Sequence, residues 1–162
     1  MSSKNIENSV CEKPAGNQLQ LVTFGVGPAI LALDISSIQE INRNLKFTKV
    51  PHAPSFVRGV TNLRGEVVTI VDLHVVLGMK QAEVSSQSRN LIVKHDDELL
   101  GLWVDRIADI MTINTTALSS PPANLQGVPR KLIRGVHQTP ESLVMILDLD
   151  EFMIACHASE SA

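Results

Sequence analysis

The ionisable side chains of this 162-residue chain do not form a familiar catalytic or metal-binding pattern. Asp72 and Asp148 first suggest a pair of carboxylates for acid–base chemistry, but each precedes a short apolar stretch typical of a helix start. Capping of two equivalent helices is the better interpretation, because a general acid and base must share one cleft. The histidines lack the spacing of zinc ligands; they are His52, His74, His95, His137 and His157.

The sequence also lacks the short motifs of common enzymes. It contains no Gly-x-Ser-x-Gly, no phosphate-binding Gly-Lys-Ser/Thr and no His-Glu-x-x-His. Gly25-Val26-Gly27-Pro28 follows an apolar run, yet the third glycine and the helix of a dinucleotide loop are missing. We therefore predict a hairpin turn there, and no enzyme, cofactor or metal site.

The strongest candidate for binding chemistry is a turn, Asn62-Leu63-Arg64-Gly65. Gly65 supplies the positive φ that a tight turn often needs, which would place Arg64 at the tip. A guanidinium offers five donors in a planar fork, suited to carboxylates and backbone carbonyls of a partner. The alternative is an ordinary exposed turn arginine with no partner.

This turn lies in a unit that occurs twice in the chain. Val57-Arg58-Gly59-Val60 recurs as Ile133-Arg134-Gly135-Val136, and Ile70-Val71-Asp72-Leu73 recurs as Ile146-Leu147-Asp148-Leu149, each at an offset of 76 positions. A constant spacing over two blocks indicates a duplicated folding unit. The second copy replaces the Asn62 turn with Gln138-Thr139-Pro140-Glu141, so the first turn has a role that the fold alone does not require.

The apolar pattern around these motifs predicts mainly strands. Strands are expected at residues 19–26, 30–34, 47–50, 67–71, 91–94 and 99–105, joined by hairpin turns. Residues 67–71 are nearly all apolar, which predicts burial of both faces. Residues 35–41 fit either a short helix or a bent strand, while Asp72 and Asp148 cap short helices, the second at about 150–155.

Composition favours a folded, branched-aliphatic β protein. Hydrophobic residues make up 44% of the chain and aromatic residues only 3%, and the net charge is −3, which gives no reason to expect nucleic acid. Cys11 and Cys156 lie near the two ends, in segments expected to be mobile, and form no disulfide framework. With no apolar signal core and no long apolar run, the protein is expected in the cytoplasm, without direct membrane insertion.

We predict an all-β fold with a few short helices, in which two five-stranded β barrels related by duplication pack together. The expected division is a disordered tail at 1–17, a first lobe at 18–79, a linker at 80–89, a second lobe at 90–155 and a C-terminal tail at 156–162. Half of this chain would be marginally stable alone.

One sector has an unusual charge. Between Ile41 and Gly65 there are five basic residues and no acidic residue. Such a sector suits an acidic partner, because complementary charge sets encounter rate and register. The alternative is a solvated rim of the barrel. The basic residues are Arg43, Lys46, Lys49, Arg58 and Arg64.

With these motifs in order, residues 18–155 resemble the CheW family of bacterial chemotaxis coupling proteins. The matching stretches are 33–35, 38–41, 54–65 and 70–73, followed by 101–105, Ile107 and Ile110. The resemblance implies two SH3-like barrels and a non-enzymatic, cofactor-free adaptor. Such an adaptor joins the regulatory domain of the histidine kinase CheA to the cytoplasmic tips of methyl-accepting chemoreceptors, and is recruited to receptor arrays through these partners.

The resemblance also implies two faces. The residues that match kinase-coupling positions are Gly59, Asn62, Leu63, Arg64, Gly65 and Glu40. Those that match the receptor groove are Ile38, Ile41 and Val60. Trp103 stands where the family usually has a smaller aliphatic residue, which would reshape the packing nearby, and residues 129–141 match poorly.

Rival functions make different demands on the sequence. The same domain serves pilus-linked and other chemosensory-type pathways, which the sequence does not separate. A small-barrel nucleic-acid binder would need surface aromatic residues for base stacking, and this chain has five aromatic residues in an acidic balance. An enzyme would need a titratable group in a closed pocket with a large pKa shift.

Overall fold

The computed structural model describes residues 17–43, 46–80, 83–123, 125 and 128–161, and shows an all-β protein with two five-stranded sheets. Of the predicted tail at 1–17, residues 1–16 with Cys11 lie outside the described residues. The first sheet has the order β8 (Arg106–Asn114), β1 (Gln18–Val26), β2 (Ala29–Asp34), β10 (Leu143–Leu147), β9 (Ile133–Gln138). The second has the order β3 (Ile38–Asn42), β6 (Arg89–His95), β7 (Glu98–Val104), β5 (Glu66–Asp72), β4 (Val57–Leu63).

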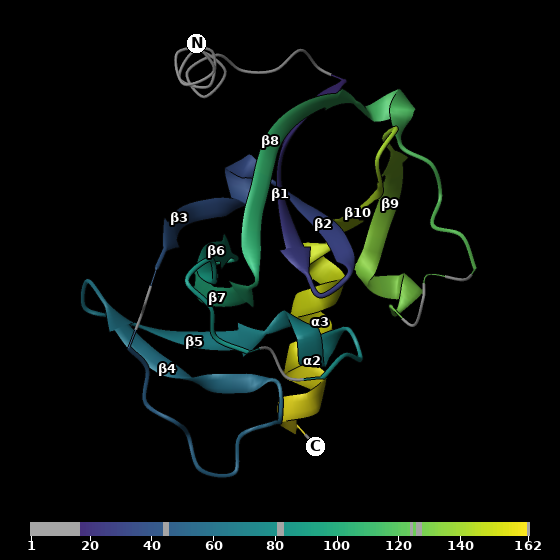
Figure 1. Cartoon of the computed structure of the whole chain (residues 1–162). Helices are drawn as coiled ribbons and strands as arrows, with labels where there is room; N and C mark the ends of the chain where they lie inside the picture. Colours follow the sequence, from purple (N-terminus) through teal and green to yellow (C-terminus); the bar gives the residue numbers. More distant parts are fainter. Residues whose placement is uncertain (1–16, 44–45, 81–82, 124, 126–127, 162) are drawn as a thin grey trace.

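The two sheets interleave the two halves of the chain (Figure 1). The first sheet takes β1 and β2 from the first half and β8, β9 and β10 from the second, while the second sheet takes β3, β4 and β5 from the first half. The predicted lobes at 18–79 and 90–155 therefore do not correspond to the two sheets, and that part of the prediction was wrong. The cause is the parallel pairing of β10 with β2 and of β5 with β7, which exchanges three strands between the repeats.

The duplication itself is confirmed by matched backbone contacts. Each sheet is closed by a short strap of chain, through the antiparallel bridges Thr48–Val60 and Ser119–Val136. In the first, the Thr48 and Val60 amides donate to each other's carbonyls at 2.8 and 2.9 Å, and in the second both bonds measure 2.9 Å. The straps explain the repeated glycine, because a Cβ on Gly59 would lie 2.4 Å from the Thr48 carbonyl oxygen.

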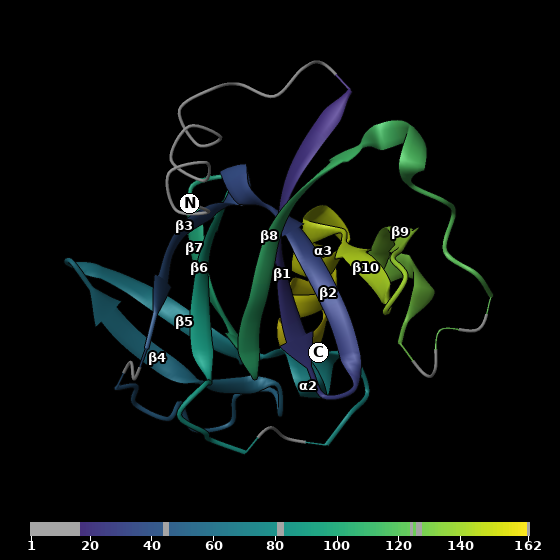
Figure 2. The same ribbon diagram turned by 45° about the horizontal axis from the view of Figure 1, so that its top comes forward.

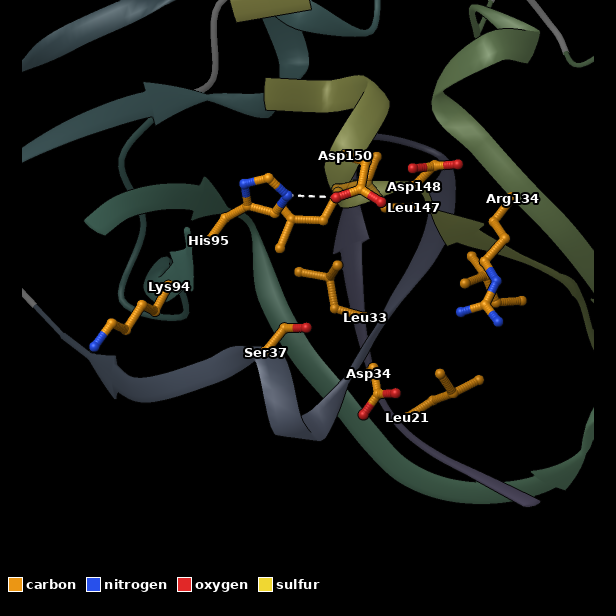
Figure 3. Close-up of a pocket in the computed structure, with 12 residues that line it drawn as sticks. Leu21, Leu33, Asp34, Ser37, Lys94, His95, Arg134, Leu147, Asp148 and Asp150 are labelled. Carbon is orange, nitrogen blue, oxygen red and sulfur yellow. Dashed lines mark hydrogen bonds and ion pairs between the residues drawn. The ribbon is translucent and has the colours of Figure 1, made fainter. Parts of the chain in front are cut away.

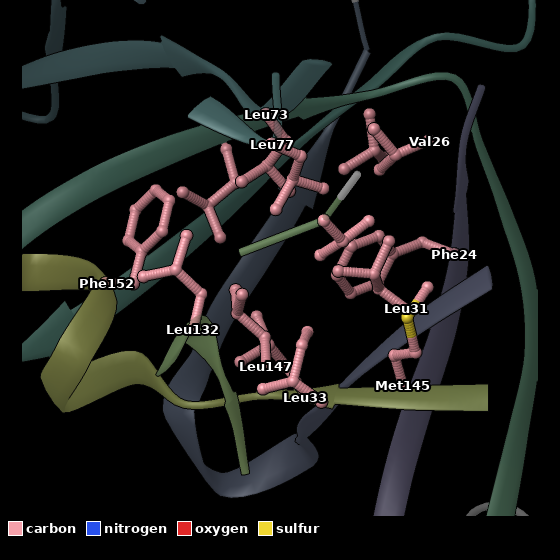
Figure 4. Packing of buried hydrophobic residues seen from close by; sticks show 14 of the residues in the cluster. Phe24, Val26, Leu31, Leu33, Leu73, Leu77, Leu132, Met145, Leu147 and Phe152 are labelled. Atoms are coloured by element: carbon pink, nitrogen blue, oxygen red, sulfur yellow. The ribbon is translucent and has the colours of Figure 1, made fainter. Parts of the chain in front are cut away.

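One hydrophobic core joins both sheets and both helices (Figure 4). Alternate residues of β2, such as Leu31 and Leu33, face this shared core, while Ala32 faces a smaller cluster of the first sheet. Trp103 belongs to a corresponding small cluster of the second sheet. Each fully buried leucine contributes about 1.5–3 kcal/mol. The interleaved sheets therefore stabilise each other.

The helices begin where the sequence predicts and one of them ends later. Asp72 caps α2 (Leu73–Val76), its carboxylate accepting from the His74 amide at 2.9 Å. Asp148 accepts from the Glu151 amide at 3.1 Å at the start of α3 (Leu149–Ser161). The expected C-terminal tail at 156–162 was wrong for 156–161, which are helical, and Cys156 is buried. Phe152, Met153 and Cys156 bury one face of α3 in the shared core, which extends the helix.

Three single-turn 3-10 helices complete the described elements: η1 (Ile35–Ser37), η2 (Thr115–Ala117) and η3 (Arg130–Leu132). Residues 35–41 thus form a helical turn followed by a strand. The turn at Gly27-Pro28 joins β1 and β2 as a hairpin, as predicted. Full burial of residues 67–71 was wrong at Val67, which is 69% exposed near the end of the β4–β5 hairpin. That hairpin projects from the rest of the molecule (Figure 2).

Candidate functional site

The tip of the β4–β5 hairpin is a tight two-residue loop. Leu63 pairs with Glu66, so that only Arg64 and Gly65 connect the strands. Both have positive φ, 54° for Arg64 and 85° for Gly65, as in the type I′ turns that match strand twist. The Asn62 carbonyl oxygen Oδ1 accepts from the Gly65 amide at 3.0 Å. The predicted turn is therefore correct, and Arg64 adopts a backbone conformation that usually favours glycine or asparagine.

Arg64 is held by a single carboxylate from another strand. Its Nη1 lies 2.9 Å from Oε2 of Glu40 on β3. The other oxygen of Glu40 accepts from the Asn42 side-chain amide at 2.8 Å, which fixes the orientation of the carboxylate. The Arg64 side chain is 79% exposed and Glu40 only 18%. The ion pair therefore orients the guanidinium and leaves most of its donors facing solvent.

This ion pair brings together two residues of the predicted kinase-coupling set that lie on different strands. β3 and β4 stand at opposite ends of the strand order of the second sheet. The contact of Glu40 with Arg64 shows that the sheet curls until its ends meet, as in a small barrel. Gly59 lies buried near the base of the hairpin, and Leu63 packs on the small cluster around Trp103. The six candidate residues thus belong to one end of one barrel.

The three receptor-groove candidates lie on the same barrel with different exposure. Ile38 is half-buried against the shared core, Ile41 is 42% exposed, and Val60 is half-buried opposite Thr48. Ile38 and Ile41 come from β3 and Val60 from β4, so the barrel closure brings their strands together. The three cavities described for this structure are lined by other residues.

Sequence reasoning did not identify a buried charge network beneath the hairpin. Nη1 of Arg58 lies 3.2 Å from Oδ2 of Asp72, and Oδ1 of Asp72 lies 3.1 Å from Nδ1 of His74. His74 Nε2 then lies 2.9 Å from Oδ2 of Asp105, which also accepts from the Gly27 amide at 2.8 Å. The network links β4, α2 and the β1–β2 turn, and so ties the hairpin to the other sheet. No motif in the sequence signals it.

The Arg58 guanidinium also stacks on an aromatic pair. Its central carbon lies 4.4 Å from the Trp103 ring centre and 5.8 Å from that of Phe47. The two rings meet edge to face at 6.3 Å. Desolvated cation–π contacts of this kind contribute about 2 kcal/mol. Trp103 therefore packs with Phe47 and Arg58 in the second sheet, next to the candidate site.

A cavity of about 320 Å³ near the start of α3 is an alternative site (Figure 3). His95 and Asp150 form an ion pair at one end, and Lys94 and Arg134 lie on opposite sides of the view. The hydrogen bond with Asp150 raises the pKa of His95 above its usual value. Ser37 lines the same cavity, but no hydrogen bond joins it to His95 in the described structure, so the nucleophile–base link of a hydrolase is not made.

In the described ranges, no group of three or more histidine, cysteine, aspartate or glutamate side chains is placed to hold a metal ion. No helix within those ranges has both the length and the apolar content needed to cross a membrane.

The geometry defines a class of protein: a duplicated double β barrel whose most distinctive polar feature is an exposed arginine on an oriented hairpin. Such a feature suits recognition of another protein. The model of the CheW-like domain matches residues 20–155. The chain therefore belongs to the CheW family.

Relatives and a solved structure agree with this assignment. The chain is 32% identical to the chemotaxis protein CheW of Treponema pallidum over 82% of this chain and 80% of that protein. It is also 32% identical to the chemotaxis protein CheW of Helicobacter pylori, over 91% and 90%. The crystal structure of the scaffolding protein TtCheW from Thermoanaerobacter tengcongensis superimposes with a TM-score of 0.75 at 26% identity, covering 80% of this chain and 88% of that one.

Proposed function

We propose that this protein is a non-enzymatic adaptor that couples the regulatory domain of the histidine kinase CheA to the cytoplasmic tips of methyl-accepting chemoreceptors. The observation that carries the proposal is the Arg64–Glu40 ion pair, which holds a largely exposed guanidinium at the tip of a projecting hairpin. Membership of a family of chemotaxis scaffold proteins supports it.

The kinase-binding face consists of the hairpin and the side chains that orient it. Arg64 supplies directional donors, Asn62 and Gly65 form the turn, and Glu40 orients the guanidinium from β3. Gly59 lets the strap approach β4, and Leu63 anchors the hairpin next to its tip on the apolar cluster. A preorganised arginine loses little conformational entropy on binding, which favours it as a binding hot spot.

The receptor-binding face uses Ile38, Ile41 and Val60. A partly exposed branched aliphatic surface suits the apolar face of a helix, which is the recognition mode expected for a helical receptor tip. Ile41 is the most exposed of the three at 42%. The protein acts in the cytoplasm and reaches the membrane-bound array through its partners.

The experiment that tests the function is a pair of NMR titrations of isotope-labelled protein. One uses the CheA regulatory domain and the other a receptor-tip helical hairpin. We expect the kinase to perturb residues 59–65 and Glu40, and the receptor to perturb Ile38, Ile41 and Val60. Perturbation by neither partner at high concentration would refute the adaptor function.

A matched pair of variants separates a specific contact of the first hairpin tip from a general effect of altering a hairpin tip. Arg64→Ala removes the exposed guanidinium, while Glu141→Ala changes the equivalent turn of the second repeat, where the residue is also exposed. We expect Arg64→Ala alone to weaken the kinase-induced shifts. Equal weakening by both variants would remove the hairpin from the interface.

A further inference from the structure

The two straps close their barrels through equivalent backbone bridges, but they differ strongly in charge. The strap of the second sheet, residues 43 and 46–50, carries Arg43, Lys46 and Lys49, all exposed. Its counterpart, residues 114–120, is Asn-Thr-Thr-Ala-Leu-Ser-Ser and has no charged residue. Both make the same pair of backbone hydrogen bonds, to Val60 and to Val136. Closure of a barrel therefore does not require cations, and the charge of the first strap needs another explanation. We call this segment the basic strap.

The basic strap is held firmly against β4. Besides the Thr48–Val60 bridge, the Thr61 hydroxyl donates to the Lys46 carbonyl at 2.7 Å. Phe47 turns inward, and its ring meets the Trp103 ring edge to face. The strap is therefore a preorganised surface, and its cations project from a fixed backbone.

Its cations also differ from the other two basic residues of the sector. Arg58 pairs with Asp72 and Arg64 pairs with Glu40. The side chains of Arg43, Lys46 and Lys49 form no ion pair or hydrogen bond with the described part of the chain. Along β4 and β5 the exposed acidic residue is Glu66, which lies beside the hairpin tip. Within the described residues, the strap thus presents three uncompensated positive charges.

We infer that the basic strap is an electrostatic docking surface for an acidic face of the protein that binds the β4–β5 hairpin. Continuity supports this, because the strap bridges the same strand, β4, that leads to Arg64. Single-stranded nucleic acid is disfavoured, because the aromatic side chains here are half-buried or buried and offer no stacking surface. A membrane surface is disfavoured because, among the described residues of the strap, Val50 at 41% is the only exposed large apolar side chain.

The inference rests on the proposed function for the identity of the partner, the kinase regulatory domain. Rim charges mainly accelerate association, whereas buried anchors such as an oriented arginine slow dissociation. The strap should therefore control the association rate and its salt dependence, and Arg64 should control the dissociation rate.

The test measures association and dissociation rates of the full chain with the CheA regulatory domain by stopped flow at low and moderate NaCl. The double variant Lys46→Gln/Lys49→Gln removes two strap charges. Lys131→Gln/Arg134→Gln removes two exposed charges from the second repeat and is the matched control. We expect about a tenfold slower association for the strap variant at low salt and less than about a twofold change for the control. The difference should shrink as salt screens it.

Three outcomes decide the inference. Equal rates for the two double variants, or a strap effect confined to dissociation, would overturn it while leaving the adaptor function intact. If the unchanged protein binds no kinase domain, the proposed function fails instead.

The strap is then judged by NMR titration with a synthetic peptide of ten glutamates: shifts confined to residues 43–50 support an acidic protein partner. No shifts, or tighter binding of a ten-nucleotide DNA or of anionic phosphatidylserine vesicles, overturn it.

Discussion

The β4–β5 hairpin and the β9–β10 hairpin are copies of one unit that have diverged at their tips. In both copies a glycine faces a strap. In both, the amide of the capping aspartate donates at 2.7 Å to the carbonyl of the residue before the first strand: Asp72 to Phe56, and Asp148 to Leu132. The first tip is a two-residue loop whose arginine reaches another strand. The second tip is a four-residue turn whose hydrogen bonds are made within the turn.

The second turn shows what the fold alone requires. The Thr139 amide donates to the Ser142 carbonyl at 2.8 Å, and the Ser142 amide donates to the Thr139 hydroxyl at 3.0 Å. The Gln138 side chain donates to the Ser142 carbonyl at 3.1 Å. Such a turn connects two strands without strain or outside partners. The positive φ of Arg64 and its ion pair are therefore additional to folding, which favours a role in binding.

The largest difference between the copies should appear at the two capping aspartates. Asp72 is fully buried and contacts Arg58, His74 and the α2 amide, whereas Asp148 is half-buried. Asp72→Ala should lower the free energy of unfolding by about 3–5 kcal/mol, because it removes the carboxylate from beside a guanidinium that is only 12% exposed. Asp148→Ala should cost only about 1 kcal/mol, the value of a helix cap. Urea denaturation monitored by the single tryptophan measures both, and similar losses would show that the charge network contributes little.

The two glycines should differ next. A Cβ on Gly59 would lie 2.4 Å from the Thr48 carbonyl oxygen, while one on Gly135 would lie 3.2 Å from that of Ser119. Gly59 also has a φ of 155°, which side chains rarely adopt. Gly59→Ala should destabilise by roughly 2–4 kcal/mol and Gly135→Ala by about 1 kcal/mol. Urea denaturation midpoints of the two variants test this prediction. A larger loss of stability for Gly135→Ala would mean that the second strap leaves less room for a side chain than the first.

The two tips should differ in binding and hardly at all in stability. Arg64→Ala removes an ion pair whose arginine is 79% exposed, so stability should change by less than about 0.5 kcal/mol. Kinase binding should weaken about tenfold or more, as for an interface hot spot. Glu141→Ala should change neither property. Calorimetric titration and thermal melting check this, and a melt well below that of the unchanged protein would show that Arg64 has a structural role.

Local sequence patterns predicted the individual hairpins and helix starts, whereas long-range strand pairing determined how they are arranged. The hairpins, the aspartate caps and the 76-residue repeat follow from turn chemistry and apolar pattern, and the structure confirms them. The same pattern does not say whether a strand pairs within its own repeat or with the other, because both copies have equivalent edges. The exchange of strands through the β2–β10 and β5–β7 pairs was therefore missed.

In the candidate site, too, local features were predicted from the sequence and long-range contacts were not. Arg64 and Gly65 were identified from the turn sequence, because a tight turn restricts which residues fit. Glu40 came only from the family resemblance, and its contact with Arg64 joins residues 24 positions apart through barrel closure. The stack of Phe47, Arg58 and Trp103 could not be predicted either, since it depends on where the strap crosses β4. Trp103 was only flagged as an unusual residue at its position.

The smallest expected effect concerns the residues that follow the two capping aspartates. His74 pairs with Asp105, and its counterpart in the second repeat, Asp150, pairs with His95, so acid and base are exchanged. The hydrogen bond that His95 donates to Asp150 raises the pKa of His95 above 6.5 in the folded protein. The pair therefore stabilises fully below the unfolded pKa and loses this contribution as pH rises through the folded pKa.

Because Asp150 is 81% exposed, this contribution should stay below about 1 kcal/mol. Stability measured by urea denaturation at about pH 6 and about pH 8.5 should fall slightly more in the unchanged protein than in Asp150→Asn, where the amide carries no charge for the imidazolium to pair with. Asp97→Asn, an exposed neighbour in the same β6–β7 turn, should keep the pH dependence of the unchanged protein. Identical pH profiles for all three proteins would show that this ion pair does not hold α3 to the second sheet.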